Sequence, residues 1–184
     1  RVNRRMRTFF ALDVPAQSKL AIARWRESAF RSLEAGGLAP PVPASNFNMT
    51  LAFIGELPKR KLEQMCDRVD DLLGSKPCAA GIVELNEVGY WPRNGILWLG
   101  PAQCPGELQQ LATRLRTLAG QAGGKRESKA FQPHISLFRR CTIAPPASLS
   151  APEFAVSYAE ITLFESHRGD QGASYQPIHS WTLG

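Results

Sequence analysis

The chain has 184 residues, of which 43% are hydrophobic and 21% are charged, and its formal net charge is +6. This composition is that of an ordinary globular protein, and no apolar run approaches the ~20 residues that a membrane-spanning helix needs. No signal peptide is recognisable, so we expect one soluble, cytoplasmic, monomeric domain over residues 1–184, large enough to form a core without a metal or disulfides.

Much of the positive charge lies at the N-terminus. Arg1, Arg4, Arg5 and Arg7 supply four of the 22 basic residues, and the rest of the chain has 18 basic against 16 acidic residues. We therefore expect residues 1–6 to form a flexible basic arm, and the net charge alone is weak evidence for RNA binding. The four cysteines are scattered without a C-x-x-C pair, which favours reduced, structural thiols over a zinc site.

The hydrophobic pattern predicts ten elements. In chain order we expect strands at 8–14, 47–54, 79–91, 95–100, 131–139, 159–166 and 174–183, and helices at 17–34, 59–73 and 105–119. The clearest helix is 59–73, in which Leu62, Met65 and Val69 follow the helical repeat and Gly74 follows the end. The irregular alternation with hairpins favours an α+β fold with antiparallel sheets, and no Gly-rich nucleotide motif is present.

Two segments of the chain repeat one short pattern. Asn48-Met49-Thr50-Leu51 aligns without gaps with His134-Ile135-Ser136-Leu137, and each copy falls in an expected strand. Side chains alternate along a strand, so the polar residue and the hydroxyl two places later share one face. Two facing copies would surround a phosphodiester, with hydroxyls binding its oxygens and ring nitrogens exchanging protons with the attacking and leaving oxygens.

This pattern resembles the two-histidine phosphoesterase superfamily, and within it the RNA 2′,3′-cyclic phosphodiesterases, also called 2′-5′ RNA ligases. The contexts "TLAFIGE" and "PHISL" and the opening "RTFFALDVP" carry the resemblance over essentially the whole chain. It implies a single bilobal α+β domain with two pseudo-symmetric lobes, each an antiparallel sheet with helices outside, and an active-site cleft between them. It also implies a reaction without metal or cofactor. RNA ends with a 2′,3′-cyclic phosphate would be hydrolysed to 2′-phosphates, with weak 2′-5′ ligation as the reverse type of transfer.

The same resemblance implies a role for each motif residue. His134 is the general base on water, position 48 is the site of the general acid on the 3′-oxygen, and Thr50 and Ser136 hold phosphoryl oxygens. Arg139 takes the place of an arginine that faces the phosphate.

Asn48 departs from the family pattern, in which position 48 is a histidine. An amide cannot deliver a proton near neutral pH, whereas histidine titrates at about pH 6.5. Because a general acid contributes ~10²–10⁴-fold, we expect substrate binding and a slow residual reaction. Natural divergence and a deliberate His→Asn change that traps a ligand both account for the asparagine.

Three classes of function stay open from the sequence: an impaired enzyme, a non-catalytic module that binds nucleotides or RNA ends, and a structural protein without phosphate affinity. Near His134, a cluster of basic residues with only Glu127 opposing it modestly favours phosphate binding. Its members are Lys125, Arg126, Lys129, Arg139 and Arg140. Trp91 and Tyr175 are candidates for stacking a base. His167 and His179 are expected at the surface, and the three histidines offer no credible zinc or magnesium site.

Overall fold

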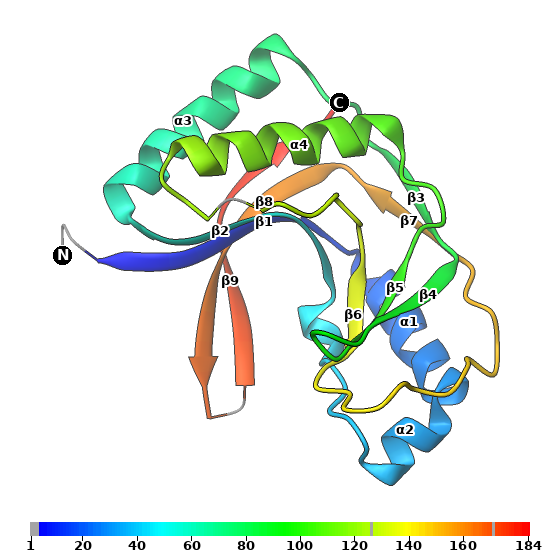
Figure 1. Cartoon of the computed structure of the whole chain (residues 1–184). Coiled ribbons are helices and arrows are strands. Elements are labelled where there is room, and N and C mark those ends of the chain that lie inside the picture. Colours follow the sequence, from blue (N-terminus) through cyan, green and yellow to red (C-terminus); the bar gives the residue numbers. More distant parts are fainter. Residues whose placement is uncertain (1–3, 126, 171) are drawn as a thin grey trace.

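A computed structural model describes residues 4–125, 127–170 and 172–184 (Figure 1). The strands are β1 (Arg5–Asp13), β2 (Asn48–Pro58), β3 (Gly81–Leu85), β4 (Glu87–Trp91), β5 (Ile96–Gly100), β6 (Ile135–Phe138), β7 (Phe154–Tyr158), β8 (Glu160–Gly169) and β9 (Gly172–Thr182). The helices are α1 (Ala16–Ala29), α2 (Arg31–Gly36), α3 (Lys59–Ser75) and α4 (Gly106–Gln121), with a 3-10 turn η1 at Ala44–Asn46. The pairings of these strands are antiparallel, which confirms the predicted α+β class.

The strands form two lobes, and each copy of the motif lies at an edge strand of one sheet, β2 in the first and β6 in the second. The first lobe is a sheet of order β2-β1-β8-β9, on which α3 and α4 pack. The second lobe contains the sheet β4-β5-β6 and the pair β3-β7, together with α1 and α2 (Figure 1). In the described ranges, no helix combines the length and apolar character that a membrane crossing requires.

One continuous hydrophobic core joins the two lobes. Phe10 and Met49 from the first lobe belong to the same buried cluster as Leu99 and Ile135 from the second, and all four side chains are fully buried. Burial of these alternate strand positions leaves the intervening residues on the opposite face of each sheet. This opposite face carries the polar residues of the two motifs.

The expected N-terminal arm is wrong for its last residues. Arg5 and Met6 are the first residues of β1, and Met6 is only 7% exposed because it packs in the core. Before the strand, the guanidinium of Arg4 forms an ion pair with Glu165 at 3.0 Å. Residues 1–3 lie outside the described residues.

The helices expected at 59–73 and 105–119 are confirmed, but several other boundaries differ. The single helix expected at 17–34 is divided at Phe30, which leaves helical geometry (φ −128°, ψ 45°) and places its ring in the core. The strand expected at 79–91 divides at Asn86 into β3 and β4, which join different sheets. Strand β7 was not expected, because five residues give too short an alternation to stand out after the Pro/Ser/Ala loop.

Candidate active site

In each copy of the motif, the first polar residue and the hydroxyl residue two places later were predicted to share one face of the strand. The alternation of burial confirms this in both copies. Met49 and Ile135 are fully buried, whereas the four polar residues that flank them are half-buried. Those four are Asn48, Thr50, His134 and Ser136. One detail differs: His134 lies just before β6, because Pro133 has no N–H to extend the ladder and the strand begins only at Ile135.

Strand pairing places the first copy beside small and polar neighbours. Asn48 is opposite Asp13, and Thr50 is opposite Ala11, on the adjacent strand β1. The Asp13 carboxylate is paired with the ammonium group of Lys19 at 3.4 Å. Opposite Thr50, the Ala11 side chain is only a methyl group.

The second copy lies against two tryptophans. Ser136 pairs with Trp98, and the ring of His134 meets Trp91 edge to face, with centroids 4.6 Å apart and an interplanar angle of 82°. The ring centroids of Trp98 and His134 are 6.3 Å apart. The Trp98 indole also lies over Gly89, where an added Cβ atom would be only 2.1 Å from it. Glycine at 89 is therefore required for this indole position, which in turn supports the imidazole.

The hydrogen bond of His134 fixes its tautomer. Its Nδ1 is 2.8 Å from the carbonyl oxygen of Gln132, and since a carbonyl only accepts, Nδ1 carries the proton and Nε2 keeps its lone pair. Burial lowers the pKa of His134 below its ordinary value of 6.5, the bond to Gln132 partly opposes this, and the charge of Arg139 lowers the pKa further. The imidazole is thus neutral near pH 7 and can accept a proton.

Arg26 is a buried arginine, not predicted from the sequence, that lies between the second motif and the segment leading into the first. Arg26 of α1 is 6% exposed, and its Nη1 donates to the carbonyl oxygens of Val42 (2.6 Å) and Leu137 (2.9 Å). Its guanidinium also lies 5.1 Å from the ring of Phe47 and 5.5 Å from that of Phe138. Phe47 precedes Asn48 and Phe138 follows Ser136 by two residues, and β2 and β6 contact each other directly.

One signal in the sequence could have identified Arg26. It lies four residues after Ile22 and four before Phe30, on the stripe of α1 that faces the core. A charged residue at such a position is rarely fully buried unless it has partners. The pattern therefore indicates a buried arginine with acceptors, although it does not say which acceptors.

The predicted basic cluster has a mixed outcome. Arg139 and Arg140 are exposed and lie just after β6. Lys125 and Lys129, which precede β6, are also exposed, and Arg126 lies outside the described residues. The expected opposing charge, Glu127, is engaged elsewhere. Its carboxylate pairs with Arg116 at 3.6 Å and accepts a hydrogen bond from the backbone N–H of Phe53 at 3.0 Å.

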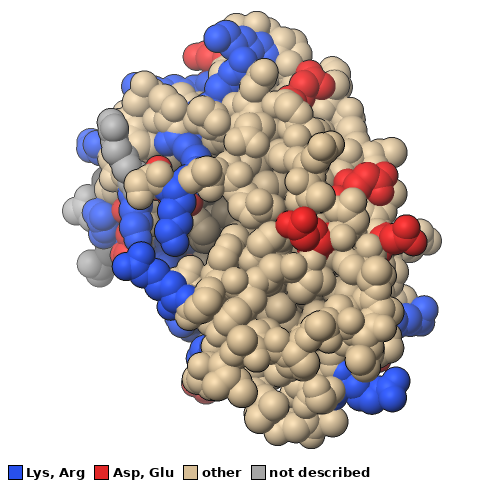
Figure 2. Space-filling view, turned by 45° about the vertical axis from the view of Figure 1, so that its right-hand side comes forward, with Lys and Arg blue, Asp and Glu red and all other residues tan. Residues whose placement is uncertain are grey.

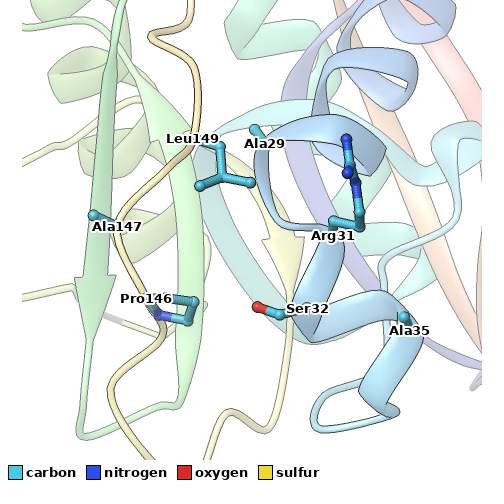
Figure 3. A pocket seen from close by; sticks show the side chains of 7 residues that line it. All are labelled: Ala29, Arg31, Ser32, Ala35, Pro146, Ala147 and Leu149. Carbon is cyan, nitrogen blue, oxygen red and sulfur yellow. The ribbon is translucent and has the colours of Figure 1, made fainter.

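The remaining candidates lie apart from the motifs. His167 is half-buried and 3.2 Å from the Glu165 carboxylate, while His179 is exposed and stacks edge-on against Trp181. The described residues include no group of three or more His, Cys, Asp and Glu side chains placed to hold a metal ion. A pocket between α2 and the 146–149 segment is lined by none of the motif residues (Figure 3).

Comparison with known proteins identifies the family. Residues 14–169 match the family model described as the 2′-5′ RNA ligase superfamily. The RNA 2′,3′-cyclic phosphodiesterase of Escherichia coli is 36% identical over 180 residues, which cover 96% of each chain. The protein of the same name from Thermus thermophilus is 28% identical over 190 residues, or 97% of this chain and 90% of that one.

Solved structures agree with this assignment. The crystal structure of E. coli LigT complexed with 3′-AMP matches with a TM-score of 0.84 at 31% identity, over 98% of this chain and 99% of that one. The two lobes and the family match define the class of the protein as a phosphoesterase of the LigT type. The chain belongs to the 2′-5′ RNA ligase superfamily.

Proposed function

We propose that this protein is an RNA 2′,3′-cyclic phosphodiesterase that converts cyclic phosphate ends of RNA to 2′-phosphates. The observation that carries the proposal is His134, a neutral imidazole with a free Nε2 two residues before a hydroxyl on the same face. Relatives that carry this name support the reaction class, and structures of LigT with 3′-AMP and ATP support a nucleotide as ligand.

In the proposed reaction, Nε2 of His134 takes a proton from a water molecule as its oxygen attacks the phosphorus atom. The bond from phosphorus to the 3′-oxygen breaks, and the phosphate stays on the 2′-oxygen. Thr50 and Ser136 donate hydrogen bonds to the non-bridging oxygens, and the exposed Arg139 adds positive charge near them. These roles are proposals for the residues of this chain.

Position 48 limits the rate of this reaction. The Asn48 amide can donate a hydrogen bond to the leaving 3′-oxygen, but it keeps its proton, so the proton must come from solvent. The same residue favours the alternative function, a module that binds RNA ends or nucleotides without turnover. Binding needs the hydroxyls and the arginine, and none of these is replaced.

The test is to restore the histidine. We expect Asn48→His to raise the hydrolysis rate of an oligonucleotide with a 2′,3′-cyclic phosphate by ~10²–10⁴-fold, since a positioned general acid contributes this much. Removing the base from the restored protein, by His134→Ala, should abolish the gain. Ligand binding with no turnover in either form would favour the binding module.

The same assay with EDTA tests a second expectation. The sequence predicts that no metal takes part, so the rate of the restored protein should be unchanged by the chelator. Loss of activity in EDTA and recovery with one added metal ion would contradict this. The expected monomeric state stays a prediction.

A further inference from the structure

The face of the first sheet that carries the motif continues into aromatic residues. Thr50 pairs with Ala11, and Phe53 pairs with Phe9, with a register irregularity between these pairs that absorbs one residue of β2. Ala11 and Phe9 are two residues apart on β1 and so share a face. Thr50 and Phe53 therefore lie on the same face, one after the other along the sheet.

These aromatic residues form a cluster of their own, apart from the main core. Phe9 lies 6.0 Å from Phe53, 5.5 Å from Phe164 of β8 and 5.0 Å from Tyr175 of β9, measured between ring centroids. Phe9 and Phe164 are buried, but Phe53 is 47% exposed and Tyr175 is half-buried. The cluster thus presents two accessible rings beside the phosphate motif.

Beyond the rings, the same face becomes basic. Every second residue of β1 shares the face of Phe9, which places Arg7 about 7 Å and Arg5 about 13 Å further along the strand. Both arginines are exposed. The neighbouring carboxylate in register with Arg7 is Glu56, whose backbone oxygen accepts a hydrogen bond from Arg5 at 3.0 Å.

Lys and Arg side chains are unevenly spread over the molecule. In Figure 2 most of them lie along the left edge and at the top of the face drawn, with a smaller group at the lower right, while several acidic side chains lie right of the middle. A single-stranded RNA needs both features that this sheet combines, which are cations for its phosphates and aromatic rings for its bases.

The chemistry decides on which side of the phosphate the RNA must lie. Water attacks opposite the leaving 3′-oxygen, and the nucleoside is attached to the phosphate on the leaving side. With His134 on the water and position 48 next to the 3′-oxygen, the nucleoside lies on the side of Asn48. This step rests on the proposed function, and it directs the RNA to the four-stranded sheet.

We propose that this face of β1, β2, β8 and β9 binds the RNA strand that precedes the cyclic phosphate. The terminal base stacks on Phe53 and Tyr175, and the phosphates of the preceding nucleotides lie against Arg7 and Arg5. The order of motif, rings and arginines along the sheet matches the order of phosphate, base and phosphate along the strand. The surface therefore selects oligonucleotides over mononucleotides.

Equilibrium binding of two product-like ligands tests the basic part of this surface. The ligands are adenosine 2′-phosphate and a tetranucleotide that ends in a 2′-phosphate, each measured at two salt concentrations. We expect the tetranucleotide to bind about tenfold more tightly. Arg7→Gln should weaken only the tetranucleotide and reduce the magnitude of its salt slope by about one. The control Arg68→Gln, at an exposed site on α3, should change neither ligand.

The aromatic part is tested by Phe53→Ala. Loss of one stacked base should weaken both adenosine 2′-phosphate and the tetranucleotide by about tenfold, because both contain the terminal base, and should leave inorganic phosphate binding unchanged. The matched control is Ile82→Ala on β3, where a large apolar side chain is 59% exposed in the second lobe. This control should bind all three ligands like the unmodified protein.

The two proposals fail in distinguishable ways. Equal affinity for both nucleotide ligands, unaffected by Arg7→Gln and Phe53→Ala, would overturn the RNA surface. Turnover by Asn48→His would then still support the proposed function. If no 2′-phosphate ligand binds and the restored protein does not hydrolyse the cyclic phosphate, both proposals are overturned.

Discussion

At the scale of single residues, the proposed role of His134 as the base makes the rate depend on its protonation state. Only the neutral imidazole accepts a proton from water, and burial lowers its pKa below 6.5. In the Asn48→His protein we therefore expect kcat/KM to fall on the acid side only below pH 6.5. Arg139→Gln should move this acid limb to higher pH, because the removed charge opposes protonation of His134. A pH–rate profile measures both.

The control for this profile is Arg68→Gln, which removes a distant exposed charge and should leave the acid limb in place. An acid limb above pH 6.5 in the restored protein, or a shift to lower pH in Arg139→Gln, would contradict the assignment of His134 as the base.

A second prediction at this scale concerns Gly89. A Cβ atom there would lie 2.1 Å from the Trp98 indole, which must move and displace the rings that support His134. We expect Gly89→Ala to lower the free energy of unfolding by about 1–3 kcal/mol and to reduce kcat more than it raises KM. The matched control is Gly106→Ala at the start of α4, where a Cβ atom meets nothing within 4 Å.

Much of the candidate site could be predicted from the sequence, because strand alternation is local. The order Asn48, Met49, Thr50 fixes which side chains share a face without any knowledge of the fold. The partners of those side chains are not local. Trp98 lies beside Ser136 through the pairing of two strands, and the two residues are 38 positions apart in the sequence. No local sequence pattern predicts this contact.

At the scale of elements, Arg26 connects α1 to β6 and to the segment that precedes β2. Arg26→Met removes the donors to Val42 and Leu137 and leaves two buried carbonyl oxygens without this partner. We expect the free energy of unfolding to fall by about 2–4 kcal/mol, measured by urea denaturation. Arg26→Lys keeps the charge and one compact donor group, so we expect it to lower the free energy of unfolding less than Arg26→Met does. An Arg26→Met protein as stable as the unmodified one would contradict this role.

The elements that the sequence predicted well are those with many repeats of one period. Helices α3 and α4 have four turns or more, so their apolar stripes are unmistakable. The strand that was not predicted is β7, which has five residues and pairs with β3 through partners such as Val83 and Val156, 73 residues apart. A five-residue strand is defined more by its partner than by its own sequence.

At the scale of the whole molecule, the shared core predicts that the two lobes unfold together. The same buried cluster contains Leu12 of β1 and Leu99 of β5, so neither lobe can lose its packing alone. Far-UV circular dichroism and tryptophan fluorescence should therefore give one coincident urea transition. In a Trp25→Phe, Trp181→Phe background, the fluorescence comes from Trp91 and Trp98 and reports on the second lobe.

Leu12→Ala tests this coupling directly, because the change is made in the first lobe and read in the second. Deleting this fully buried side chain should cost about 2–5 kcal/mol. If the lobes form one cooperative unit, the fluorescence midpoint of Trp91 and Trp98 falls by the same amount as the circular dichroism midpoint. A fluorescence midpoint that stays in place while the circular dichroism midpoint falls would show that the lobes are separate domains. The site between the two motif strands would then depend on how the domains dock, rather than on a single folding event.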